Sequence, residues 1–218
     1  MTHNRTAQFL IFTLCVLLLA GCGKKASDEV DFGVVKNSIY QNKYFGFHLT
    51  LPSEWSVQNQ EMRQRMAETG TKMLAGENTG LKAVLKASEQ QTINLFATFQ
   101  HPVGTPVSFN PSIMCVAERV RDLPGIKRGK DYHFHAKKLM KSGQIEFEFP
   151  KEISSEQLDG IDFDVMHVSM TVGPLTVQQK YYAAIMKGYA LIFVVSFSNA
   201  DEEAVLQKIL EGVSFKSS

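Results

Sequence analysis

Two histidines separated by one residue are the first pattern in the sequence that could do chemistry. On a strand, His133 and His135 would point to one face and could share a metal ion. The segment that contains them, from Asp131 to Gly143, instead has the apolar spacing of a helix, on which the two rings would point about 200° apart. We therefore expect no metal site here.

The cysteines offer a second possible chemistry. Of the three, Cys15 lies in an apolar N-terminal run, Cys22 follows that run, and only Cys115 lies in the part expected to fold. Cys115, in a segment that we predict to be helical, is either a reactive nucleophile or a buried thiol. We favour the buried thiol, because free cysteine is among the most buried residue types. A single thiol allows no disulfide framework.

The N-terminus has the pattern of an export signal. Arg5 precedes an apolar run from Phe9 to Leu19, about 11 residues long, whereas a membrane-spanning helix needs ~20. We therefore interpret residues 1–21 as a signal peptide. The polar stretch that follows, residues 22–33, is predicted to be a tether, and residues 34–218 to be one domain.

The end of the apolar run resembles the lipobox read by bacterial signal peptidase II, in which a cysteine receives the lipid anchor. The matching residues are Leu19, Ala20, Gly21 and Cys22. The resemblance implies that Cys22 is acylated and that the membrane is a partner through this anchor. Many enterobacteria retain lipoproteins in the inner membrane by an aspartate at the next position. Gly23 stands there instead, which implies the periplasmic face of the outer membrane where the cell has one.

Composition excludes several classes of protein. The apolar fraction of 44% and the charged fraction of 21% are globular values. Removal of the signal takes Arg5 and no acid, which leaves 22 basic and 22 acidic residues. Nucleic acid is therefore not expected as a partner, because phosphate binding needs an excess of positive charge.

Apolar periodicity predicts a mixed α+β domain. Alternating residues indicate strands at 38–40, 44–51, 93–99, 145–149, 161–165, 177–186, 189–197 and 213–215. Helical spacing indicates helices at 60–74, around 81–85, at 110–123, at 131–142 and at 201–211. Gly173-Pro174 and Lys187-Gly188 are turn signals, so the later strands are expected to form an antiparallel meander. The methionines at helical spacing in 60–74 are interpreted as core residues.

Two segments resemble the PsbP/Mog1 family of α/β/α sandwiches. They run from Tyr40 to Trp55 and from Tyr181 to Phe193, the latter followed by the terminal helix and strand. The resemblance implies a central antiparallel sheet flanked by helices. Members are mostly binding, assembly or accessory proteins, and the shared motifs are structural, so they imply no catalytic residue.

Charge is distributed unevenly along the chain. Residues 118–141 contain eight Lys or Arg against three acids, whereas residues 142–164 contain one Lys against seven acids. The basic stretch suggests a docking surface for anionic lipid or an acidic partner, made of Lys127, Arg128, Lys130, Lys137 and Lys138. The alternative, which we favour at this point, is that these side chains pair with the acids that follow.

These observations lead to a functional expectation. None of the common hydrolase, zinc, nucleotide or dithiol signatures occurs after Cys22, and no cofactor is expected. We predict a non-enzymatic, membrane-anchored binding or assembly protein that contacts another, unidentified protein of the cell envelope. The alternative is an envelope hydrolase whose site has no familiar signature. A deep pocket with convergent polar groups would favour the enzyme, and an apolar groove or patch would favour the binding protein.

The lipid anchor can be tested by one substitution. Cys22→Ser removes the thiol that the lipobox resemblance assigns to acylation, and no other segment in the sequence is long and apolar enough to span a bilayer. We expect the variant to appear in the soluble envelope fraction, whereas the wild type sediments with membranes. Cys115→Ser is the matched control and should remain with the membranes. A Cys22→Ser variant that is still firmly membrane-bound would refute the assignment.

Overall fold

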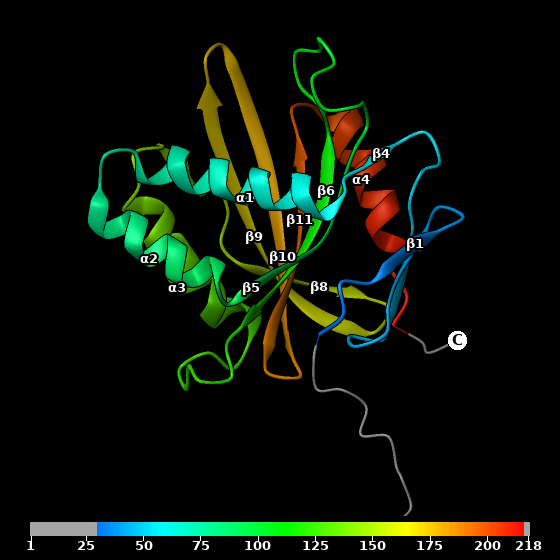
Figure 1. Ribbon diagram of the computed structural model, residues 1–218, viewed down its shortest axis with the longest axis horizontal. Coiled ribbons are helices and arrows are strands. Elements are labelled where there is room, and N and C mark those ends of the chain that lie inside the picture. The colour runs from blue at the N-terminus through cyan, green and yellow to red at the C-terminus, as the bar shows by residue number, and fades with distance from the viewer. Residues whose placement is uncertain (1–29, 216–218) are drawn as a thin grey trace, which may run out of the picture.

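The computed structural model describes residues 30–215 as one layered α+β domain (Figure 1). The predicted signal peptide, the lipobox and Cys22 lie outside the described residues. Among residues 30–215, no helix is both long enough and apolar enough to cross a bilayer.

An eight-stranded antiparallel sheet forms the centre of the domain. Its strands are β4 (Ser56–Val57), β5 (Thr92–Phe99), β6 (Ser112–Arg119), β7 (Phe147–Glu148), β8 (Ser154–Leu158), β9 (Ile161–Val172), β10 (Leu175–Met186) and β11 (Tyr189–Phe197). Their order is β4-β5-β6-β11-β10-β9-β7, and β8 pairs with β9. The meander predicted for the last strands is therefore present, with Met186 opposite Tyr189 across the Lys187-Gly188 turn.

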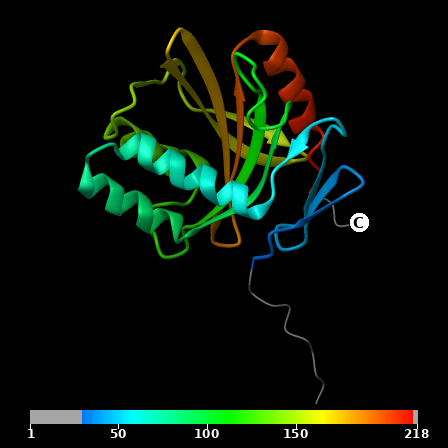
Figure 2. The same ribbon diagram turned by 45° about the horizontal axis from the view of Figure 1, so that its top comes forward.

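Helices and a small second sheet cover the two faces of this sheet. One face carries α1 (Gln60–Ala75), α2 (Thr79–Glu89) and α3 (Gly129–Lys141). The other carries α4 (Ala200–Glu211) and a three-stranded sheet of β1 (Val34–Lys36), β2 (Ile39–Asn42) and β3 (Phe47–Thr50). The two layers are seen from a second angle in Figure 2. The predicted class, a central antiparallel sheet flanked by helices, is confirmed.

The larger core lies between the central sheet and the layer of α4 and β1–β3. Phe47 on β3 contacts Phe193 on β11 with ring centroids 5.5 Å apart, and it contacts Phe215 at 5.6 Å. The alternation predicted for this strand is confirmed, because Phe45, Phe47 and Leu49 are all buried. Trp55, just after the strand, is buried as well.

The N-terminal residues of the described chain are packed against the small sheet. Val30 is buried, and the Asp31 carboxylate accepts hydrogen bonds from the backbone N–H of Gly33 at 2.7 Å and of Tyr44 at 3.0 Å. The Asn42 side chain donates to the carbonyl of Asp31 at 2.9 Å. Residues 30–33, which the sequence places in the tether, thus make contacts of the folded domain.

The predicted helix at 110–123 is wrong. Residues 112–119 form β6, which pairs with β5 on one side and β11 on the other. Ile113, Cys115 and Ala117 alternate and are fully buried, as in a strand. Ile113, Val116 and Val120 also have helical spacing, and pairing with two neighbouring strands decides between the two states. Asn110, at the start of the predicted helix, closes the loop before β6 by accepting from the backbone N–H of His101 and donating to its carbonyl.

Smaller differences concern element ends and exposed faces. β8 was not predicted, because its sequence is mostly polar and exposed. On α1, Met62 and Met66 are only half-buried and Met73 is exposed, so the core interpretation of these methionines holds only in part. The predicted last strand is a single bridge between Ser214 and His48. On α4, the apolar residue Val205 is exposed.

The aromatic core predicts a large difference between two phenylalanines. Phe47→Ala removes a ring that is 2% exposed, and truncation of a buried Phe costs roughly 3–5 kcal/mol. Phe134→Ala, at a residue that is 66% exposed on α3, should change the free energy of unfolding by less than about 0.5 kcal/mol. Urea unfolding measures both. Equal stability of the two variants would contradict this assignment of the core.

Candidate functional site

A cavity of about 740 Å³ opens between α2, α3 and the loop that joins β6 to α3. Its walls are mainly apolar, and a few polar side chains interrupt them. The apolar lining comes from Leu74, Val84, Val120, Leu123, Pro124, Ile126, Ala136, Leu139 and Met140. A second hollow of about 510 Å³, between α1, α2 and β5, has a more polar lining that includes Gln64, Glu68 and Glu89.

Local sequence explains how these walls are held. The Asn78 side chain caps α2 by accepting from the N–H of Leu81 at 2.9 Å, which presents Val84 and Ser88 one turn apart on the same face. The Asp131 carboxylate accepts from the backbone N–H groups of Lys127 and Arg128 at 3.0 and 2.9 Å. These bonds fix the start of α3 and the loop before it.

Asp131 stands at the third position of α3 and caps the helix from there. The bonds from Lys127 and Arg128 lower the pKa of its carboxyl, because they favour the charged form.

Glu118 is the centre of the polar groups in the cavity. Its Oε1 accepts from the Ser88 hydroxyl at 2.8 Å, and its Oε2 accepts from the Tyr132 hydroxyl at 2.7 Å. Burial raises the pKa of Tyr132 well above its ordinary value, and the charge of Glu118 raises it further. Tyr132 therefore keeps its proton and serves as a fixed donor.

A second tyrosine of the lining, Tyr181, donates to the side-chain oxygen of Gln179 at 2.8 Å, and burial raises its pKa too. Tyr132 and Tyr181 are thus two protonated phenols whose hydroxyls already have partners inside the protein. Neither is free to exchange a proton with a ligand at neutral pH.

The predicted docking residues are distributed over different surroundings. Lys138 lines the cavity, whereas the Lys137 ammonium lies over the ring of Phe149 at 4.6 Å. Lys127, Arg128 and Lys130 are exposed at the start of α3. Within residues 30–215, none of the five forms an ion pair with a carboxylate. The expected pairing with the acids of residues 142–164 is therefore not seen in the described chain.

The two histidines of α3 point to different surroundings. His133 is fully buried, and its Nε2 lies 2.8 Å from the carbonyl oxygen of Asp164, whereas His135 is exposed beside the cavity. The helix therefore keeps the two rings apart, as its geometry predicts. In the part of the chain that the structure describes, no three His, Cys, Asp or Glu residues are grouped as metal ligands. Burial lowers the pKa of His133, although the contact with Asp164 acts in the opposite direction.

Cys115 is a core residue. It lies on β6 rather than on a helix, is fully buried, and burial raises the pKa of its thiol well above the ordinary value. The prediction of a buried core thiol is confirmed.

Sequence reasoning missed the cavity itself. The helix assigned to 110–123 separated Glu118 from Ser88 and Tyr132, and only the strand places these three residues together. One signal was available. The alternation of Ile113, Cys115 and Ala117 also fits a strand, and a strand ending in Glu118 would have pointed to the sheet end beside α3.

Comparison with solved structures supports the fold. The chain is similar to the solution structure of cyanobacterial PsbP from Synechocystis, with a TM-score of 0.50 and 11% identity over 90% of this chain and 98% of that one. It is also similar, with a TM-score of 0.41, to LpqN, described as involved in cell envelope biogenesis of Mycobacterium tuberculosis; identity is 14% over 77% of this chain and 82% of that one.

A third similar structure is a protein of unknown function from Pseudomonas aeruginosa described as a putative regulator. Its TM-score is 0.41, at 13% identity over 53% of this chain and 78% of that one. No protein-family model matches the sequence, and no curated protein matches it. The domain thus has a PsbP-like fold, and its site is characterised by its own geometry.

The buried histidine predicts a pH dependence of stability. Since the pKa of His133 is lowered from 6.5 in the folded state, the unfolded chain binds a proton first as pH falls. The stability that neutral His133 contributes should be present above pH 6.5 and lost below it. As pH is lowered from 7.5 to 5, the melting temperature should therefore fall less steeply for His133→Gln than for the wild type. The exposed control His135→Gln should keep the wild-type slope. An unchanged slope in His133→Gln would contradict this account.

Proposed function

We propose that the chain is a lipid-anchored protein of the cell envelope that binds an apolar ligand, such as an acyl chain, in the cavity between α2 and α3. The observation that carries the proposal is the size and chemistry of the cavity. A volume of about 740 Å³ falls within the roughly 300–1,000 Å³ of small-molecule sites, whose walls are mostly apolar with a few placed polar groups.

The polar groups of the cavity support binding rather than catalysis. Both carboxylate oxygens of Glu118 already accept a hydrogen bond from a hydroxyl group. The hydrogen-bonding needs of this network are therefore met within the protein. In a hydrolase the Ser88 hydroxyl would need a general base that is free to take its proton. Its acceptor, Glu118, is already shared with the Tyr132 hydroxyl, and among the described residues no hydrogen bond joins His135 to Ser88 or Glu118.

The rim of the cavity suits a ligand with a polar or anionic end. Lys138 and His135 both contribute to the lining, and both are exposed on α3. An elongated amphiphile could place its apolar part between Val84, Ala136 and Leu139 and leave its head at these side chains.

The lipid anchor proposed at Cys22 supplies the cellular context. It would hold the domain at a membrane surface, close to lipid acyl chains. The lipobox resemblance implies that this surface is the periplasmic face of the outer membrane. An envelope protein that delivers or receives the ligand would be the further partner. Nucleic acid is not proposed, because the exported chain has no excess of positive charge.

Filling the cavity tests the proposal. Ala136 lines it from α3, so Ala136→Trp should occupy the space that a ligand needs. A fluorescent fatty acid is titrated into the unlipidated exported chain, made with Cys22→Ser. We expect the protein with the wild-type cavity to bind one equivalent of the fatty acid. Ala136→Trp should bind it at least about tenfold more weakly, a loss of about 1.4 kcal/mol in binding free energy.

Phe134→Trp is the matched control, because it places the same side chain on the exposed face of the same helix. It should bind as the wild type does. Circular dichroism melts confirm that both variants are folded. Equal affinity of all three proteins, or the absence of saturable binding, would refute the cavity as the ligand site.

A further inference from the structure

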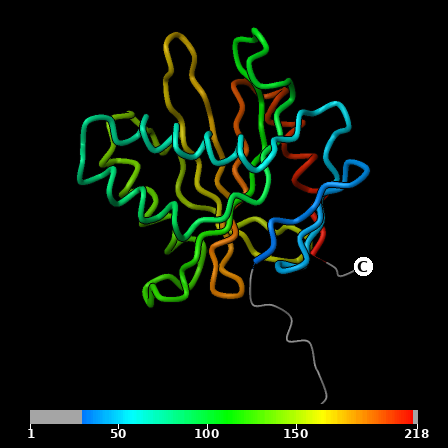
Figure 3. The backbone as a smooth tube through the Cα atoms, viewed as in Figure 1, coloured from blue at the N-terminus to red at the C-terminus, as the bar shows by residue number. Residues whose placement is uncertain are grey.

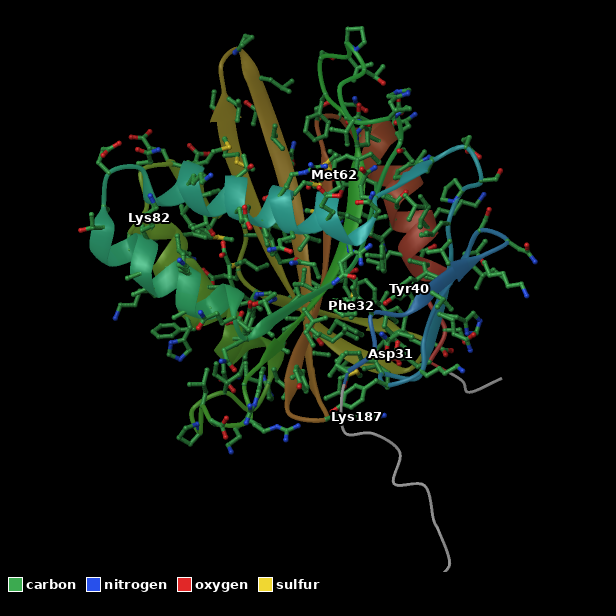
Figure 4. The ribbon with its side chains drawn as sticks, in the orientation of Figure 1. Asp31, Phe32, Tyr40, Met62, Lys82 and Lys187 are labelled. Carbon is green, nitrogen blue, oxygen red and sulfur yellow. The ribbon has the colours of Figure 1, made fainter. Side chains whose placement is uncertain are left out.

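One end of the domain brings together the start of the described chain, two turns and the loop that walls the cavity. Asp31 accepts from the N–H of Tyr44, and the Tyr44 hydroxyl is 3.5 Å from the carbonyl of Lys187. Lys187 in turn donates to the carbonyl of Tyr44. Figure 4 shows Asp31 and Lys187 near each other at this end.

The contacts continue from the β10–β11 turn into the β6–α3 loop. The N–H of Val120 donates to the carbonyl of Gly188 at 3.0 Å, and the Arg121 guanidinium lies 5.7 Å from the ring centroid of Tyr189. The backbone trace shows this loop and the turn at the same end of the sheet (Figure 3). The described chain therefore begins at the same end of the domain as the loop of the cavity (Figure 3).

This end has exposed basic and apolar side chains, which we call the entry surface. Its members are Lys43, Arg121, Leu123, Lys127, Arg128 and Lys187, and all of them are exposed. Leu123, an apolar side chain in the loop between β6 and α3, is 49% exposed.

The acids at this end already have partners. Asp122 pairs with Arg119 at 2.8 Å, Asp131 accepts the backbone N–H groups before α3, and Asp31 accepts those of Gly33 and Tyr44. Glu118 lies further inside, between Ser88 and Tyr132. The five cations of the entry surface form no ion pair with a carboxylate within residues 30–215.

The length of chain before Val30 limits how far this end can lie from a bilayer. Seven residues lie between Cys22 and Val30, and the eight steps from one Cα to the next correspond to at most about 29 Å of extended chain. An anchor at Cys22 would therefore hold the entry surface close to the headgroups, where basic side chains are attracted to anionic lipid.

We propose that the entry surface docks on the anionic phospholipid headgroups of the bilayer that carries the anchor, with Leu123 inserted at the interface. The inference rests on the proposed lipid anchor and deepens the proposed function. Leu123 belongs both to this surface and to the cavity lining, so docking would place one wall of the cavity against the bilayer from which its ligand comes. Charge and tether length favour a bilayer over an acidic protein as the occupant.

The test uses the full lipidated protein in vesicles. A fluorophore is attached at Leu123→Cys, which is the accessible thiol because Cys115 is buried and Cys22 would be acylated. The control position is Val103→Cys, which is equally exposed but lies in the loop at the opposite end of β6. Vesicles contain phosphatidylcholine with or without phosphatidylglycerol, and nitroxide-labelled lipids serve as quenchers.

We expect lipid quenching at Leu123 to exceed that at Val103 at least threefold in phosphatidylglycerol vesicles, and to fall with salt. Lys43→Gln with Lys127→Gln should reduce the difference at least twofold. Lys151→Gln with Lys208→Gln, two exposed lysines elsewhere, should not. Equal quenching at both positions, or quenching at Leu123 that is independent of phosphatidylglycerol, would overturn the proposal.

Two further measurements separate this proposal from those it rests on. The mass of the purified protein reports acylation, and a chain without acyl groups would overturn both the anchor and the docking. Ala136→Trp in the labelled protein should abolish fatty-acid binding and retain quenching at Leu123. Loss of quenching in that variant would contradict a docking surface that is separate from the cavity. Absence of fatty-acid binding in the wild type, with quenching intact, would refute the ligand proposal alone.

Discussion

Burial of β11 on both of its faces is the constraint on which the rest of the structure depends. This strand lies in the middle of the sheet, bonded to β6 and β10, and all its residues after Tyr189 are buried. Phe193 points into the core beneath β3 and α4, while Ile192 packs toward α3 on the other face. A strand that is apolar on both sides requires a layer on each, and so the α+β sandwich follows from it.

The cavity results from how the helical layer meets that sheet. Gly129, at the start of α3, lies so close to β10 that a Cβ would overlap the carbonyl oxygen of Ala183, and this contact seats one end of the helix. Farther along α3, Leu139 packs with Leu81 and Leu85 of α2. The space between these two points of contact is left to the loop after β6, whose Leu123 and Pro124 complete the wall without filling it.

Much of this architecture could be predicted from the sequence, because most elements have a single apolar period. Alternation identified the strand with Phe45, Phe47 and Leu49, and alternation together with the turn signals identified the final meander. The helix predicted at 110–123 was wrong because Ile113 fits both the helical and the strand period. Residues 112–119 form a strand because they bond to β5 and β11. The candidate site depended on that segment, so Glu118 and its partners could be recognised only in three dimensions.

The central claim, that the space between α2 and α3 holds an apolar ligand at the membrane, is tested most directly by native mass spectrometry. The lipidated protein is purified from its own envelope, and wild type is compared with Ala136→Trp. The account predicts one non-covalent apolar molecule per wild-type chain and none in the variant, whose cavity is filled. A wild-type chain without a bound molecule, or the same molecule retained by Ala136→Trp, would contradict it.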